Sequence, residues 1–217
     1  MVPVPVNPVQ KILGIDRYHG DAKFDWQKLK TAGVVWEYSK ASDGNSFSDY
    51  SLQEATEAAE EAGILTAAYH FFRANCTTQS QLSNFLSSIK GLKFNLPHFF
   101  DYEAESLQGQ SVSTQIMRAD GLLKGMADNL GKAPIIYWES DILEEIAKQL
   151  PPDWEQYPVV IARYTSDASR IGLMGPFTNL FGWQDTDSAV IDGIPAGHTV
   201  DRDWFFGSAD DLAVYAK

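Results

Sequence analysis

The sequence predicts an α/β fold, an incomplete β/α barrel with about eight strands and fewer than eight outer helices. Short apolar or β-branched runs alternate with longer segments of helical period along the 217 residues, and strands separated by helices favour a parallel sheet. From 157 to 203, by contrast, no 3.6-residue apolar period stands out, and glycine and proline interrupt the chain. We therefore expect full helices on the first five strand–helix units only.

Each expected element has its own local signal. The strands are short apolar and β-branched runs at 11–18, 34–40, 64–71, 96–103, 134–138, 159–164, 180–184 and 198–201. The helices are segments of helical period at 25–31, 51–62, 78–88, 113–129 and 141–149, with a last short one at 209–215. Glutamates beside alanines crowd the second helix, a pattern typical of a solvated helix face.

The composition limits the classes of protein to which the chain can belong. The chain is 44% hydrophobic and 21% charged, which is enough apolar material for a globular core. Seventeen Lys and Arg against 29 Asp and Glu give a formal net charge of −12, which argues against nucleic-acid binding and against docking on an anionic membrane. Cys76 is the single cysteine, so an internal disulfide and a cysteine-built zinc site are excluded. The main apolar stretches are far shorter than the ~20 residues that span a bilayer.

We expect one catalytic domain over 12–217, preceded by an extended arm over 1–11. The arm carries Pro3, Pro5 and Pro8 and has no basic segment, so it does not resemble a signal peptide. No linker long enough to divide two domains interrupts the rest of the chain.

Acidic residues stand where several predicted strands end. Asp16 follows the first apolar run, Asp101 and Glu103 end the fourth strand, and Asp201 ends the last. In a barrel of parallel strands the carboxyl ends form the mouth that carries the active site. We therefore expect these four side chains to converge on one mouth.

Asp101 and Glu103 form the most informative pair. Their i, i+2 spacing on a strand puts both carboxyl groups on one face and Tyr102 on the other. Because one charge raises the pKa of its neighbour, the pair would hold one protonated acid and one anion, which is the equipment for glycosidic bond cleavage. The simpler interpretation is a pair of exposed acids, and a metal held with Asp16 and Asp201 is a third.

Aromatic residues gather near the same strand ends, where they would either stack on the apolar faces of a sugar or pack in the core. They are Tyr18, Tyr69, Phe71, Phe72, Tyr137, Trp138, Tyr164 and Trp183. Other chemistries lack their motifs: there is no G-x-S-x-G, no complete phosphate loop, and no H-E-x-x-H around the four scattered histidines. We expect no cofactor and no metal.

Eight segments, taken in order, resemble motifs of the family 25 glycoside hydrolases, the muramidases found among phage endolysins and bacterial and fungal lysozymes. They are GIDRYHG at 14–20, EYSKASDG at 37–44 with Asp49 after it, AGILTAAYHFF at 62–72, FDYE at 100–103, PIIY at 134–137, IARY at 161–164, WQ at 183–184 and VD at 200–201. The resemblance covers about 12–207. Arg17 and Tyr18 depart from the hydrophobic residue and serine that usually follow the first aspartate of this family.

The resemblance implies an irregular TIM-like β/α barrel that cleaves the β-1,4 bond between N-acetylmuramic acid and N-acetylglucosamine in peptidoglycan. Glu103 is implied as the general acid and Asp101 as the group that orients or stabilises the substrate, with Asp16 and Asp201 completing an acidic cleft. The implied substrate-binding residues are Tyr69, His70, Tyr137, Arg163, Tyr164, Trp183 and Gln184.

Two alternatives remain open at this point: a noncatalytic glycan-binding barrel, and an N-acetylhexosaminidase or chitinase-like activity. The expected partner is the glycan strand of peptidoglycan, with no nucleic acid and no membrane insertion, and the expected state is a monomer. We expect synthesis in the cytoplasm and action on the cell wall after release or delivery, by phage lysis or secretion.

Overall fold

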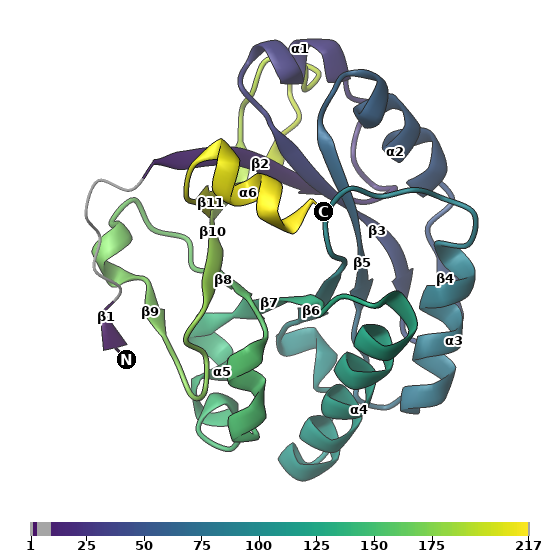
Figure 1. Cartoon of the computed structure of the whole chain (residues 1–217), viewed down its shortest axis with the longest axis vertical. Coiled ribbons are helices and arrows are strands. Elements are labelled where there is room, and N and C mark those ends of the chain that lie inside the picture. The colour runs from purple at the N-terminus through teal and green to yellow at the C-terminus, as the bar shows by residue number, and fades with distance from the viewer. Residues whose placement is uncertain (1, 4–9, 217) are drawn as a thin grey trace.

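Eight strands close into a barrel in the computed structural model of the chain, which describes residues 2–3 and 10–216 (Figure 1). In chain order they are β2 (Lys11–Arg17), β3 (Trp36–Asp43), β5 (Leu65–Phe71), β6 (Phe99–Tyr102), β7 (Ile135–Glu139), β8 (Val159–Ala162), β10 (Leu180–Ala189) and β11 (Val200–Phe206). Parallel pairing of β2 with β3 closes the ring. The predicted β/α barrel is confirmed.

Two short pairings lie outside this ring. Strand β4 (Phe47–Ser48) folds back on the end of β3, and β1 (Val2–Pro3) pairs with β9 (Gly172–Leu173). The predicted arm over 1–11 falls largely on positions outside the described residues, so its boundary and that of the domain stay predictions.

Six α-helices lie in the described part of the chain, all close to predicted positions. They are α1 (Trp26–Thr31), α2 (Leu52–Glu61), α3 (Thr78–Ser88), α4 (Val112–Leu130), α5 (Ser140–Ala147) and α6 (Ala209–Tyr215). Side-chain oxygens of Asp25, Thr77 and Ser111 accept backbone N–H groups at the starts of α1, α3 and α4, which satisfies otherwise unpaired donors. From 157 to 203 the only helical segment of the described chain is a 3₁₀ turn, Ala168–Arg170, as the lack of helical period predicted.

The barrel interior is filled by aromatic side chains. Tyr38 stacks on Phe99 with ring centroids 4.1 Å apart, and Trp36 stacks beside them. Gly14 makes room for this layer, because a Cβ at that position would lie 2.2 Å from the Trp36 ring. The interior is therefore a packed core below the mouth.

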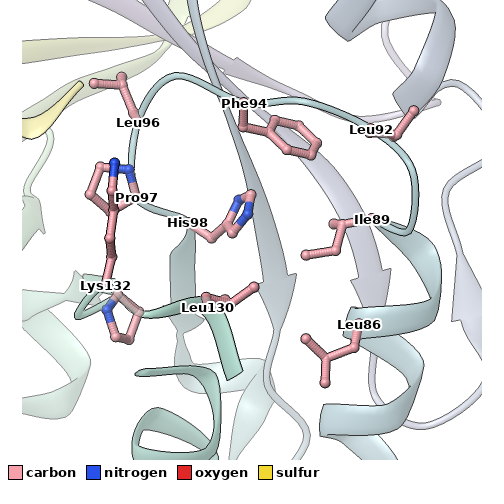
Figure 2. Close-up of a pocket in the computed structure, with 10 residues that line it drawn as sticks. Leu86, Ile89, Leu92, Phe94, Leu96, Pro97, His98, Leu130 and Lys132 are labelled. Atoms are coloured by element: carbon pink, nitrogen blue, oxygen red, sulfur yellow. The ribbon is translucent and has the colours of Figure 1, made fainter. Parts of the chain in front are cut away.

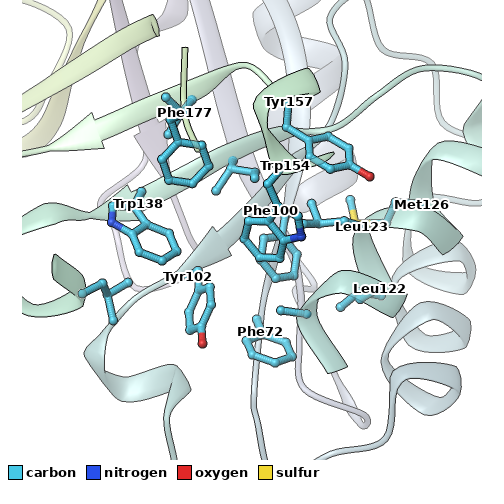
Figure 3. Close-up of a cluster of buried hydrophobic side chains, with 14 of the residues drawn as sticks. Phe72, Phe100, Tyr102, Leu122, Leu123, Met126, Trp138, Trp154, Tyr157 and Phe177 are labelled. Atoms are coloured by element: carbon cyan, nitrogen blue, oxygen red, sulfur yellow. The ribbon is translucent and has the colours of Figure 1, made fainter. Parts of the chain in front are cut away.

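A second core joins the barrel wall to its outer helices (Figure 3). Phe100, Tyr102 and Trp138 point outward from β6 and β7 and pack against α4 and the segment around Trp154. The Tyr102 hydroxyl donates to Gln115 of α4 at 3.2 Å. The outward position of Tyr102 confirms the alternation expected along this strand, which leaves its neighbours Asp101 and Glu103 to the inside.

The last barrel strand runs against the direction that the sequence predicted. Strand β11 is antiparallel to both β10 and β2, and it begins at Val200, where the predicted strand was ending. Asp201 therefore lies near the start of its strand. Because the strand is reversed, its start lies at the mouth formed by the carboxyl ends of the parallel strands.

Helix α6 closes the opposite mouth. It follows the end of β11, and its Leu212 and Tyr215 pack under Phe181 and Phe205 of the barrel interior. This leaves the mouth near Asp16 and Glu103 as the open one. Among the described residues, no helix combines the length and the apolar character needed to cross a bilayer.

Candidate active site

The four predicted acids line one cleft of about 440 Å³ at the open mouth. Asp16 lies on β2, Asp101 on β6, Glu103 directly after β6, and Asp201 at the start of β11. The side chains that share the cleft with them are Tyr18, Asp21, Tyr38, Lys40, Tyr69, Phe71, Glu105, Tyr137 and Gln184. The structure thus brings together residues that lie far apart in the sequence.

Strand β6 aims its carboxyl groups into the cleft. Asp101 is buried, whereas Glu103 is partly exposed at the point where the strand gives way to a 3₁₀ turn. The Glu103 backbone is anchored on both sides, because its N–H donates to Ser106 Oγ at 3.0 Å and its carbonyl accepts the Ser106 N–H at 3.0 Å. The carboxyl group is thus held at the mouth by a fixed main chain.

Burial is the main cause of the altered acidity of this pair. Together with the nearby charge of Glu139, it raises the pKa of Glu103 to about 7. It also raises the pKa of Asp101 well above its ordinary value, with a further contribution from the Glu103 charge. The ionisation of each carboxyl group therefore depends on the other, and the two titrate together.

Asp101 also presents an open acceptor. Its Oδ1 is buried and has no hydrogen-bond partner among the described side chains and backbone groups. A buried acceptor without a partner is costly, so a ligand N–H or O–H bound here would gain a favourable bond.

Gln184 links Asp16 to two tyrosines in a hydrogen-bonded network. Gln184 donates its amide N–H to Asp16 at 2.8 Å, and the Gln184 carbonyl accepts the Tyr137 hydroxyl at 2.7 Å and the Tyr164 hydroxyl at 3.0 Å. Burial, then the charges of Asp201 and Asp203, raise the pKa of Asp16 well above its ordinary value.

Asp203 is a member of this site that the sequence analysis missed. It is fully buried, its charge contributes to the raised pKa of Asp16, and its Oδ1 accepts the Tyr38 hydroxyl at 3.0 Å. Burial, followed by the charge of Asp201, raises its pKa. The same i, i+2 rule that singled out Asp101 and Glu103 applies to Asp201 and Asp203, so the signal was present in the sequence.

A second hollow of about 450 Å³ adjoins the first and shares Glu103, Tyr137 and Asp201 with it. Glu139, Arg163 and the half-exposed Tyr164 line its far side. Because both hollows meet at Glu103, an elongated ligand can lie across this carboxyl group with one part in each hollow.

Two of the expected substrate-binding residues lie outside the cleft lining. His70 is fully buried in the barrel wall, hydrogen-bonded to Ser42 and Gln81, and burial lowers its pKa to about 4. Trp183 is also buried and donates its indole N–H to the carbonyl of Arg163 at 2.7 Å. Both side chains support the wall, whereas Tyr69, Tyr137 and Gln184 line the cleft and Arg163 and Tyr164 line the adjoining hollow.

A pocket of similar size at the other end of the barrel has a different character (Figure 2). It encloses about 410 Å³ and is lined mainly by apolar side chains such as Phe94, with no carboxylate. His98 in this pocket accepts the Ala68 N–H, and burial lowers its pKa to about 4. The acidic chemistry is confined to the open mouth. Among the described residues, no group of three or more His, Cys, Asp or Glu side chains is arranged to hold a metal ion.

A β/α barrel with neighbouring carboxyl groups at its open mouth fits the class of carboxylate-based glycoside hydrolases. The model of glycosyl hydrolases family 25 matches residues 15–194, and the chain belongs to this family.

Individual relatives agree with this assignment. The autolytic lysozyme of Clostridium acetobutylicum is 29% identical over an alignment of 209 residues that covers 92% of this chain and 62% of that protein. The chain thus spans less than two thirds of that relative's length. The uncharacterized protein YegX of Escherichia coli K12 is 26% identical over 94% of this chain and 73% of its own length.

Solved structures share the fold. A family GH25 lysozyme from Aspergillus fumigatus superposes with a TM-score of 0.84 at 22% identity, covering 96% of this chain and all of that one. A bacterial lysozyme from Streptomyces coelicolor gives 0.81 at 22% identity, covering 94% and 96%. The irregular barrel is therefore the fold of these lysozymes.

Proposed function

We propose that the protein is a muramidase, which hydrolyses the β-1,4 bond between N-acetylmuramic acid and N-acetylglucosamine in peptidoglycan. The observation that carries the proposal is the Asp101–Glu103 pair: two neighbouring carboxyl groups that line one cleft, with the pKa of Glu103 raised to about 7. Membership of family 25 and the similarity to an autolytic lysozyme support the choice of substrate.

In this proposal Glu103 is the general acid. Its proton passes to the glycosidic oxygen as the bond from that oxygen to the anomeric carbon breaks, and Glu103 is left as a carboxylate. The oxygen of a water molecule then bonds to the anomeric carbon, and a proton of this water returns to Glu103. A carboxyl group with a pKa near the working pH is suited to this transfer, because a useful fraction is protonated. Glu103 lies where the two hollows meet. If one sugar occupied each hollow, the bond between them would lie beside the Glu103 carboxyl group.

Asp101 is the stabilising partner. Its unpaired Oδ1 is available to accept the N–H of the substrate's 2-acetamido group, which would hold that group against the anomeric carbon. As an anion it would also offset the positive charge that develops there. Asp16 and Asp201 complete the acidic wall, and Gln184 fixes Asp16.

The remaining walls suit a sugar. Tyr69 and Tyr137 present ring surface to the cleft, and Tyr164 does so in the adjoining hollow, which matches the mixed apolar and polar surface of a pyranose. We propose that the protein acts as a monomer on the cell wall after release or delivery from the cytoplasm.

Mass analysis of the fragments released from purified peptidoglycan tests the reaction. A muramidase leaves N-acetylmuramic acid at the new reducing end, and Glu103→Gln should release almost none of these fragments. Reducing-end N-acetylglucosamine, or cleavage of N-acetylglucosamine oligomers alone, would replace the proposal by an N-acetylhexosaminidase or chitinase-like activity. Binding to the wall without release of fragments would replace it by a noncatalytic glycan-binding barrel.

A further inference from the structure

Four aromatic rings gather on the rim of the open mouth, and we call them the rim platform: Tyr18, His19, Phe47 and Tyr50. The His19 ring lies at their centre, with its centroid 5.2 Å from that of Tyr18, 5.1 Å from Phe47 and 5.3 Å from Tyr50. They come from the segment after β2, from β4, and from the segment before α2. The platform is therefore assembled by tertiary folding at one edge of the cleft.

Its central ring is held in place. The Asp49 carboxylate accepts the His19 backbone N–H at 2.8 Å, lies 2.9 Å from His19 Nδ1, and also accepts the Ser51 hydroxyl. Burial opposes the ionisation of Asp49, but these hydrogen bonds outweigh it and lower its pKa. A buried carboxylate with two contacts to His19 thus orients the His19 ring, so the platform is preorganised.

The platform leaves apolar surface exposed. The Tyr50 side chain is 80% exposed and Tyr18 is 44% exposed. The Tyr18 ring lies across Gly20, where a Cβ would come within 2.4 Å of it. A preorganised patch of exposed aromatic surface is typical of a binding site.

The platform continues the cleft. Tyr18 and Asp21 line the cleft itself, and Asp21 and His19 line a neighbouring hollow of about 370 Å³ between the segment after β2 and helix α2. A chain of sugars that leaves the cleft on this side therefore passes over the rings of the platform.

We propose that the rim platform is a distal glycan subsite that stacks one further pyranose ring of the strand whose neighbouring rings fill the cleft. The proposal rests on the proposed function. Tyrosine rings offer flat apolar faces to the C–H face of a sugar, and Asp21 and His19 offer polar partners for its hydroxyl and acetamido groups. The arginine–tyrosine pair after Asp16, unusual for the family, supplies one of the stacking rings.

The test compares peptide-free glycan strands of two lengths, a short oligosaccharide that fills only the cleft and a longer one that reaches the rim. For Tyr50→Ala, a platform residue that does not line the cleft, kcat/KM on the long strand should fall by roughly three- to tenfold, the factor expected for one aromatic contact. On the short strand kcat/KM should stay within twofold of wild type. Met117→Ala, which removes an exposed apolar side chain on the outer face of α4, is the control and should change neither value.

Equal losses on both strands, or none on either, would overturn the subsite. The long strand is also assayed with its stem peptides attached; a loss seen only with that strand would show that the platform binds peptide, and the sugar assignment would be wrong. Failure of the wild type to cleave either strand would instead contradict the proposed function, so the two proposals fail in different ways.

Discussion

Asp16 on β2 and Asp201 on β11 are direct partners in the antiparallel ladder that closes the barrel. Directly opposed residues of such a ladder carry their side chains on the same face, with Cβ atoms about 5 Å apart. Here both point into the cleft, where like charges oppose one another. The charge of Asp201 is the second cause, after burial, of the raised pKa of Asp16. The reversed last strand is thus the feature that concentrates the acids.

The first prediction concerns the general acid. Glu103→Gln removes the transferable proton but keeps the size of the side chain, so turnover should fall by a factor of ~10²–10⁴ while the fold remains. Release of fragments from purified walls measures turnover, and thermal unfolding checks the fold. Glu144→Gln, an exposed change on α5, is the control. Activity within twofold of wild type would show that another group, with Asp16 the first candidate, is the acid.

The second prediction concerns the pH profile. With the pKa of Glu103 raised to about 7, activity should fall above neutral pH as the acid loses its proton. It should also fall on the acid side as the cleft aspartates gain protons, and this limb should lie above the ordinary aspartate range because burial raises their pKa values. The two limbs report the coupled group as a whole. A rate that still climbs above pH 9 would contradict a protonated carboxyl mechanism.

The third prediction concerns the group whose loss of a proton causes the fall in activity at high pH. Glu139 accepts the Ala104 N–H at 2.7 Å, and its charge is the second cause, after burial, of the raised pKa of Glu103. Glu139→Gln can keep the hydrogen bond but removes the charge. The alkaline limb of kcat/KM should therefore move to lower pH by roughly half a unit. A shift to higher pH, or no shift, would mean that Glu139 does not act on the proton-donating group.

The fourth prediction concerns stability. Glu37 is fully buried on the outer face of β3, where burial raises its pKa to about 8; the Ser39 hydroxyl bond and the Arg17 charge offset this only partly. Because the folded state holds this proton more tightly than the unfolded chain, the contribution to stability is present below pH ~4.3 and is lost as the pH rises towards 8.

Glu37→Gln removes this titration. The melting temperature of the variant relative to wild type should therefore be higher at pH 8 than at pH 5, by roughly 5 °C or more. Calorimetry at the two pH values measures the difference, again with Glu144→Gln as the exposed control. The same offset at both pH values would show that Glu37 is not protonated in the folded state at pH 5.

The fifth prediction concerns salt. A net charge of −12 repels an anionic cell wall, so wall cleavage should rise as ionic strength increases towards ~0.1 M, where screening shortens the repulsion to ~10 Å. A short neutral oligosaccharide should show much less of this effect. Inhibition by salt from the lowest ionic strength upward would point instead to a local basic surface that binds the wall.

Much of the fold could be predicted from local patterns. The eight barrel strands and six helices lie near the expected segments, because apolar periodicity and helix caps such as Asp25 and Ser111 act within a few residues. The direction of β11 could not be predicted in this way. A strand of either direction has the same alternation, and only pairing with β10 and β2 distinguishes them.

The candidate site, like the fold, could be predicted only in part from the sequence. The sequence by itself determined that Asp101 and Glu103 share a face, because side chains alternate along any strand. Only the tertiary structure decided that Asp203 joins Asp16, that Glu139 acts on Glu103, and that His70 lies in the wall. The burial of a side chain depends on all the neighbours that exclude water from it, and these neighbours come from strands far apart in the chain. Spacing therefore locates the acids, whereas barrel closure sets their pKa values.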